Sequence, residues 1–172
     1  WPTLMKDLEV GKFDIAMSGV SRTLERQRYG FFSRPYHIGG KTAITRCSDN
    51  NKFTSLAAID QAGVRVVVNP GGTNEQFVDA RIRHAEKIIH DDNRSIFQQI
   101  ASGKADVMIT DRIEADWQAS KQSVLCTPVK VNFTYQEKAY LMPRDIALKE
   151  FVDTWLSLRT AEGRVSELLS TE

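Results

Sequence analysis

The sequence predicts an α/β protein built as two lobes, and two observations support this prediction. First, the phrase Gly-Lys-x-Asp occurs at residues 11–14 and again at 103–106, 92 positions later. Solenoid repeats have periods of about 20–50 residues, so a single recurrence at this distance indicates one supersecondary unit used in each of two lobes. Second, a β-branched run at 64–68 leads directly into a glycine-rich turn and a helical pattern, as in a βαβ unit.

The first copy of the phrase predicts a helix followed by a strand. Apolar residues at helical spacing over 4–10 indicate a helix that ends at Gly11, a C′ residue. Alternating apolar residues over 13–17 then predict a strand. Small polar residues follow this strand, among them Ser18 and Ser21.

The second copy has the same order of elements. Apolar residues at 96, 97 and 100 predict a helix that Gly103 ends, and the run 107–109 predicts a strand. Thr110, Asp111 and Glu114 come directly after it. Because ligands of open α/β sheets bind outside the carboxyl ends of strands, the two polar clusters predict two sides of one ligand cleft.

Between the copies the pattern is that of βαβ units. We expect a strand over 41–46, a helical turn over 56–59 and a buried strand over 64–68. The turn Asn69-Pro70-Gly71-Gly72-Thr73-Asn74-Glu75 then opens a helix over 75–83, with Thr73 or a neighbour as its cap. Its backbone N–H groups favour a carboxylate or phosphate ligand, and an ordinary strand-to-helix turn is the alternative.

The last third of the chain predicts further strands and two helices. We expect strands in the apolar segments 124–125, 129–131 and 139–142, the last ended by Pro143. A helix follows, and its core face is expected to consist of Ala147, Phe151, Trp155 and Leu158. Apolar residues over 165–169 predict one more packed helix.

Composition excludes several classes of function. Lys and Arg number 23 and Asp and Glu 22, a balance that gives no basic surface for nucleic acid. No apolar run approaches the roughly 18–20 residues of a membrane-spanning helix, so no membrane insertion is expected. Cys47 and Cys126 lack the spacing of a zinc site, so no metal is expected. The two cysteines form either a disulfide or two separate buried thiols.

The motifs around both polar clusters resemble the type II periplasmic amino-acid-binding proteins. Residues 17–26 and 31–36 resemble the ligand motif of lobe one in that family. The resemblance implies that Arg26, helped by Ser21, holds a ligand carboxylate through paired charge-assisted hydrogen bonds. Gly72-Thr73-Asn74-Glu75 and Thr110-Asp111 resemble the lobe-two motif, in which Asp111 receives the ligand ammonium group.

A more specific resemblance is to the cyclohexadienyl dehydratases within this superfamily, which act on prephenate and arogenate. It runs through essentially the whole chain. The matching phrases are Asn69-Pro70-Gly71-Gly72-Thr73-Asn74-Glu75, Thr110-Asp111-Arg112-Ile113-Glu114-Ala115 and Glu137-Lys138-Ala139-Tyr140-Leu141-Met142-Pro143-Arg144-Asp145. Binding proteins rarely carry a glutamate three residues after the cleft aspartate, so Glu114 discriminates the enzymes from the binding proteins.

The resemblance implies a lyase in which Glu114 is the general acid. Prephenate loses a ring hydroxyl and CO2 to form an aromatic ring, and hydroxide leaves only when a proton is delivered to it. A carboxyl group does this near neutral pH when a closed cleft raises its pKa. The substrate ligands implied are Trp1, Ser21, Arg26, Asn69, Thr73, Asn74 and Asp111. No cofactor is implied, because aromatisation drives the reaction and the enzyme supplies positioning and a proton.

Other interpretations remain open at this point. Arg26 would also suit a solvated helix face, Glu114 an exposed first turn, and Asp111 a helix N-cap. The alternative function is a periplasmic solute-binding protein that delivers an amino acid or related carboxylate to a transporter. Both functions imply a periplasmic location and a small-molecule carboxylate ligand, and the oligomeric state is left open.

The resemblance also sets lobe boundaries. Residues 1–38 and 132–172 are expected to form lobe one, and residues 39–131 lobe two. Members of the family begin with an additional segment of lobe one, of at least ~30 residues, that would precede Trp1. We therefore expect lobe one to be partial in this chain, with its N-terminal part missing.

Overall fold

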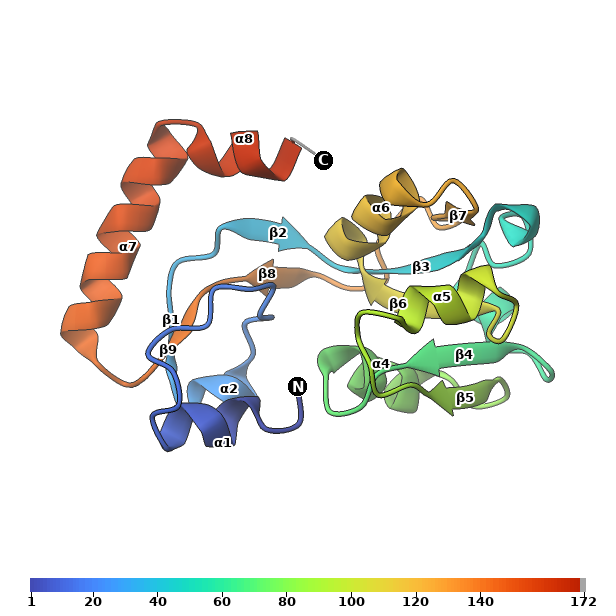
Figure 1. The fold of residues 1–172 in the computed structure, drawn as a ribbon, viewed down its shortest axis with the longest axis horizontal. Coiled ribbons are helices and arrows are strands. Elements are labelled where there is room, and N and C mark those ends of the chain that lie inside the picture. The colour runs from blue at the N-terminus through green and yellow to red at the C-terminus, as the bar shows by residue number, and fades with distance from the viewer. Residues whose placement is uncertain (171–172) are drawn as a thin grey trace. The chain divides into compact units, whose positions relative to one another are not determined.

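A computed structural model describes residues 1–170, and the chain divides into two compact units (Figure 1). Unit 1 consists of Trp1 and Gly39–Tyr135, and unit 2 consists of Pro2–Ile38 and the segment from Gln136 on. Trp1 and residues 132–135 therefore group with unit 1, whereas the sequence-based boundaries put them in lobe one.

Unit 1 is built on a mixed five-stranded sheet (Figure 1). The strands, in spatial order, are β5 (Glu86–Ile89), β4 (Arg65–Val68), β6 (Val107–Asp111), β3 (Lys41–Arg46) and β7 (Leu125–Cys126). Strand β4 runs parallel to both β5 and β6, and β3 runs antiparallel to both β6 and β7. The strands expected over 41–46, 64–68 and 107–109 are confirmed: β3 has the expected ends, β4 begins one residue later and β6 ends two residues later.

Helices cover both faces of this sheet because its central strands are apolar on both sides. One apolar layer joins alternate residues of β3, β4 and β6 to α3 (Leu56–Ile59) and α4 (Thr73–Arg81). The other layer joins the intervening residues to α5 (Ile96–Ala101) and α6 (Arg112–Lys121). Val66, Val67 and Val68, consecutive residues of β4, are all fully buried, two in the first layer and one in the second. The sheet therefore lies at the centre of unit 1.

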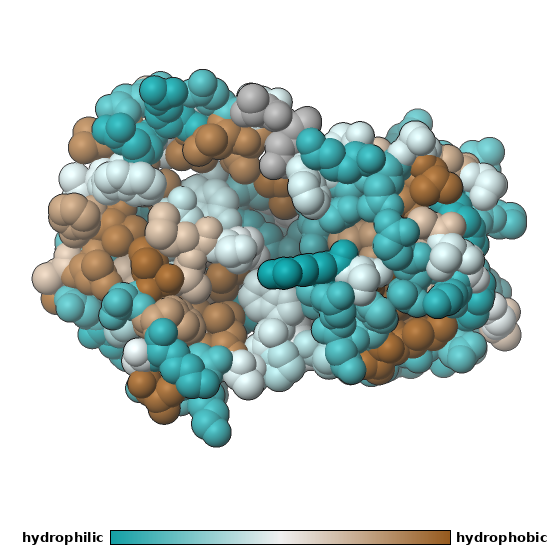
Figure 2. All heavy atoms as spheres, in the orientation of Figure 1, coloured by the Kyte–Doolittle hydropathy of each residue, from teal (hydrophilic) through white to brown (hydrophobic). Residues whose placement is uncertain are grey.

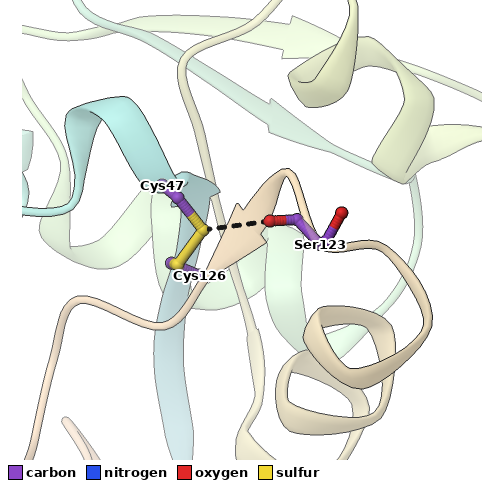
Figure 3. Close-up of a disulfide and its surroundings, with 3 residues drawn as sticks. All are labelled: Cys47, Ser123 and Cys126. Carbon is purple, nitrogen blue, oxygen red and sulfur yellow. Dashed lines mark hydrogen bonds between the residues drawn. A yellow bond between two sulfur atoms is a disulfide. The ribbon is translucent and has the colours of Figure 1, made fainter.

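The two cysteines form a disulfide at one end of this sheet (Figure 3). Cys47 begins the 3-10 helix η1 (Cys47–Asp49) directly after β3, and Cys126 ends β7. The Cys47 sulfur lies 3.5 Å from the carbonyl oxygen of Ser123. The bond links positions 79 residues apart and joins the short edge strand β7 to the end of β3.

Unit 2 has smaller sheets around one apolar cluster. Strand β1 (Phe31–Phe32) pairs with β9 (Leu141–Met142), and β2 (His37–Gly39) pairs with β8 (Gln136–Lys138). The helices are α1 (Leu4–Glu9), α2 (Leu24–Gln27), α7 (Ile146–Ala161) and α8 (Arg164–Ser170). The buried cluster consists of Leu8, Val20, Phe32, Ala139 and Leu141. Segments from both ends of the chain thus build this core.

Two predicted strands are wrong. Residues 13–17 form no named strand, because among these described residues only Ala16 makes a β-bridge, to Leu141. The Met17 side chain in this segment is 52% exposed. Residues 129–131 likewise lie outside any strand, with Val129 buried and Val131 exposed. In both segments the alternation of apolar residues is present but a paired neighbouring strand is not.

The expected core face of the last long helix is also wrong. In α7 the buried residues are Val152, Asp153 and Leu156, whereas the predicted stripe is exposed at Phe151 and Leu158. Asp153 is accommodated inside because its carboxylate accepts the Arg34 N–H at 2.6 Å and the Lys149 ammonium at 2.6 Å.

The final helix differs from prediction in the same way. Helix α8 has no buried residue within the described part of the chain, although a packed helix was expected there. Leu168, for example, is exposed. Hydrophobic surface is visible over unit 2 in Figure 2. No described helix is both long and apolar enough to span a bilayer.

Candidate functional site

The predicted site residues fall into two groups, one in each unit. Unit 1 holds Trp1, Asn69, Thr73, Asn74, Asp111 and Glu114, and unit 2 holds Ser21 and Arg26. Apart from Trp1, the residues of unit 1 come from the carboxyl ends of the parallel strands β4 and β6 and from the helices that follow them. This is the edge at which open α/β sheets bind ligands.

The centre of the group in unit 1 is Lys41, a residue that the sequence analysis did not select. Its side chain is fully buried at the start of β3, directly opposite Asp111 of β6. The ammonium donates to the Asp111 carboxylate at 2.8 Å and to the Thr73 hydroxyl at 2.9 Å. It also donates to the Asn74 side-chain carbonyl. A buried ammonium needs such partners, because an uncompensated charge in the interior costs several kcal/mol.

A directed chain of hydrogen bonds leads from Lys41 to Glu114. The Asn74 carbonyl accepts from the ammonium, and the Asn74 amide donates to the Thr110 hydroxyl at 3.0 Å. The Thr110 hydroxyl, which is fully buried, donates its one proton to the Glu114 carboxylate. Asn74 and Thr110 each accept from one neighbour and donate to the next, so the network fixes the orientation of Glu114 in the first turn of α6.

The N-terminus of α4 adjoins this network. Gly72, not Thr73, is the N-cap of α4, and no side chain caps it. The Thr73 hydroxyl, one of the expected caps beside its neighbours, accepts from Lys41 instead. The first N–H groups of a helix have no intrahelical acceptors and favour an anion. The nine-residue α4 therefore presents such groups next to a lysine–aspartate pair.

Trp1 and Asn69 lie beside the same turn. A Cβ atom added to Gly72 would lie 3.5 Å from the Trp1 ring, so the indole packs against this glycine. Asn69 is buried at the end of β4, and its amide donates to the Asn93 side chain at 2.8 Å. Its side-chain oxygen is buried, and no partner for it lies among residues 1–170. Such an acceptor suits a hydroxyl or ammonium group of a ligand.

Ser21 and Arg26 also lie close together, in unit 2. The Arg26 guanidinium donates to the Ser21 backbone carbonyl at 3.0 Å. The buried Ser21 hydroxyl accepts from the Lys138 ammonium at 2.7 Å, and the two residues form an antiparallel β-bridge. Lys138, buried itself, is a second lysine that the sequence analysis left without a role. The adjacent Glu137 pairs with Arg22 at 2.9 Å.

The sequence does contain a signal for Lys41. A lysine opens a strand whose next four residues are fully buried, and its partner in the sheet is the aspartate at a strand end. That signal becomes visible only once the register of β3 with β6 is known. Across the described chain, no cluster of three or more histidine, cysteine, aspartate or glutamate side chains could hold a metal ion.

Comparison with known proteins shows the family of the chain. The profile of the bacterial extracellular solute-binding proteins, family 3, matches residues 1–171. The cyclohexadienyl dehydratase of Pseudomonas aeruginosa is 51% identical over 164 residues, which cover 95% of this chain and 61% of that protein. The chain thus spans about three fifths of the length of this curated relative.

Two solved structures extend the comparison. An ancestral amino acid-binding protein, described as a precursor of cyclohexadienyl dehydratase, is 30% identical with a TM-score of 0.88. The match covers 98% of this chain and 72% of that structure. An ancestral cyclohexadienyl dehydratase is 46% identical with a TM-score of 0.54, over 98% of this chain and 70% of that one. The chain has the type II periplasmic-binding-protein fold and belongs to family 3 of the bacterial extracellular solute-binding proteins.

Proposed function

We propose that the protein is a cyclohexadienyl dehydratase that converts prephenate to phenylpyruvate, arogenate to phenylalanine, or both. The observation that carries the proposal is the position of Glu114 at the end of the Lys41–Asn74–Thr110 chain. A proton donor must be held in a fixed direction toward the leaving group. The identity of 51% to the Pseudomonas enzyme supports the same activity.

In the proposed reaction Glu114 donates a proton to the ring hydroxyl of the substrate. The C–O bond breaks and water leaves, while the electron pair of the breaking C–CO2 bond enters the ring and completes its aromaticity. Prephenate and one proton thus give phenylpyruvate, CO2 and water. Catalysis consists of positioning and one proton transfer, for which contributions of 10²–10⁴-fold from the acid are typical.

The remaining residues of unit 1 would bind the polar groups of the substrate. The N-terminus of α4, with Thr73 and Asn74, is proposed to bind a carboxylate, and Asn69 the ring hydroxyl or a carboxylate. Asp111 is proposed to receive the ammonium group of arogenate. For Arg26 and Ser21, the contact between them supports their proposed role as carboxylate ligands. We also propose a periplasmic location, since the family is extracellular.

The test is a turnover assay on the full-length protein. Incubation with prephenate should release phenylpyruvate, and incubation with arogenate should release phenylalanine if both substrates are used. Absence of turnover with both, together with tight binding of an amino acid in calorimetry, would contradict the proposal and identify a solute-binding protein. That alternative is supported by the likeness to the ancestral amino acid-binding protein.

A further inference from the structure

The turn between β4 and α4 is held by a glutamate outside the predicted site. Gly71 has a φ of +77°, a conformation that L side chains rarely adopt, so this turn depends on glycine. The Gly71 N–H donates to the Glu75 carboxylate at 2.8 Å. Because Glu75 lies in the first turn of α4, this bond ties the turn to the helix that it precedes.

A lysine from the edge strand fixes the other oxygen of the same carboxylate. The Lys87 ammonium, on β5, lies 3.3 Å from Glu75 Oε1 and 2.6 Å from the Asp79 carboxylate. Glu75 is therefore held from both sides, by the turn and by the neighbouring strand. The Glu75 and Lys87 side chains are 22% and 34% exposed, which leaves the pair partly screened by solvent.

The position of Gly71 decides where the site residues lie. The next residue, Gly72, packs against the Trp1 ring, and Thr73 and Asn74 then contact Lys41. A shift of the turn would move Gly72 and the first N–H groups of α4, whereas the hydrogen bonds from Lys41 hold the side chains of Thr73 and Asn74. The charge of Glu75 also lies at the end of α4 that would bind an anion, and the Lys87 ammonium offsets it.

We propose that Glu75, held by Lys87, is a positioning residue that keeps the 69–72 turn in the shape that binds the substrate carboxylate. The inference rests on the proposed function, because it names that substrate. Glu75 reaches the substrate only through the backbone of the turn. Its loss should therefore weaken substrate binding and leave the proton transfer by Glu114 in place.

The first test separates KM from kcat in the full-length protein. Glu75→Ala should raise the KM for prephenate about tenfold and leave kcat within about twofold, since one hydrogen bond to a charged group is lost. Glu75→Gln keeps an acceptor for the Gly71 N–H and should raise KM less than Glu75→Ala. Asp79→Asn, which removes a partner of Lys87 that does not touch the turn, should leave both constants unchanged. An unchanged KM in Glu75→Ala would overturn the proposal.

The second test does not depend on dehydratase activity. In the ligand-free full-length protein, Glu75→Ala should accelerate hydrogen exchange of the Gly71 amide at least tenfold, with the amides of β4 unchanged. Asp79→Asn should not change the exchange rate of the Gly71 amide. If wild type shows no turnover but the exchange result holds, the proposed function fails and the positioning of the turn stands. Equal exchange of Gly71 in wild type and Glu75→Ala would overturn the positioning itself.

Discussion

The two copies of Gly-Lys-x-Asp begin alike and then diverge in structure. Gly11 and Gly103 both follow a short helix and both adopt positive φ, +69° and +75°. After Gly103 the chain forms β6, which pairs with β3 on one side and β4 on the other. Residues 13–17, which follow Gly11, form a single β-bridge, between Ala16 and Leu141. Similar local sequence therefore ends each helix in the same way, whereas strand formation depends on neighbours that supply hydrogen-bond partners.

The two copies are alike again where their polar clusters begin. Asp111 lies opposite Lys41 in the antiparallel register of β6 and β3, and Ser21 forms an antiparallel bridge with Lys138. Both lysines are buried, and each donates to its partner's side chain. Lys41 meets a carboxylate and Lys138 meets a hydroxyl. Unit 1, which holds the proposed acid Glu114, therefore contains a buried ion pair at this position.

The largest expected effect comes from removing that ion pair. Lys41→Met leaves the Asp111 carboxylate without its buried ammonium partner, which should lower the free energy of unfolding by about 3–5 kcal/mol. It should also abolish turnover in the full-length protein. Urea unfolding measures the first effect. The control is Lys12→Met in the first copy, whose exposed ion pair with Asp7 should contribute at most about 1 kcal/mol. Equal stability losses in the two variants would contradict the account.

The second copy leads into a strand and the first does not, and this difference can be tested at the seventh residue of each copy. Ile109 is fully buried in β6, so Ile109→Ala should cost about 2–5 kcal/mol in unfolding free energy. Met17, at the same place in the first copy, is half exposed, and Met17→Ala should change stability by no more than about 0.5 kcal/mol. Thermal or urea unfolding of the two variants measures both stability changes. A large loss of unfolding free energy in Met17→Ala would contradict this difference between the two copies.

A smaller effect is expected at the aspartate of each copy. Burial alone raises the pKa of Asp106, but hydrogen bonds from Arg65 and Arg46 outweigh it and lower the pKa from 3.8 to about 2. The charged form is thus favoured by folding, and Asp106→Asn should cost ~2 kcal/mol at pH 7. Asp14 in the first copy is exposed, and Asp14→Asn should have little effect.

The lowered pKa of Asp106 also predicts that the free energy of unfolding depends on pH. A carboxylate whose pKa is lower in the folded state contributes its full stability above about pH 4 and loses it as the pH falls toward 2. Wild type and Asp14→Asn should both lose this contribution over that range, and Asp106→Asn should lack it. Parallel acid unfolding curves for all three proteins would refute this role of Asp106.

Sequence patterns predicted the parts of the fold that depend on local or fully buried runs. The β-branched residues of β4 and the glycines that end α1 and α5 belong to this class. The strand at 13–17 and the core face of α7 could not be predicted, because both depend on which neighbours are present. In α7 the side that contains Val152 and Leu156 is buried, although the neighbouring stripe with Phe151 and Leu158 is also apolar.

For the site, motifs identified residues next to strand ends but not the lysine between them. Thr73, Asn74, Asp111 and Glu114 all belong to one hydrogen-bond network. Lys41 lies about 30 residues before the nearest of them, and only the register of β3 with β6 brings it to their centre. Once the strand pairing is known, the signal is a charged residue in a buried strand that lies opposite a carboxylate at the end of the neighbouring strand.

The most direct test of the proposed function compares the first-turn glutamates that follow the two copies. Glu114 lies in the first turn of α6 and Glu25 in the first turn of α2. In the full-length protein, Glu114→Gln should lower kcat for prephenate dehydration by at least about 100-fold, whereas Glu25→Gln should stay within about twofold of wild type. Wild-type kcat in Glu114→Gln would contradict the assignment of Glu114 as the proton donor.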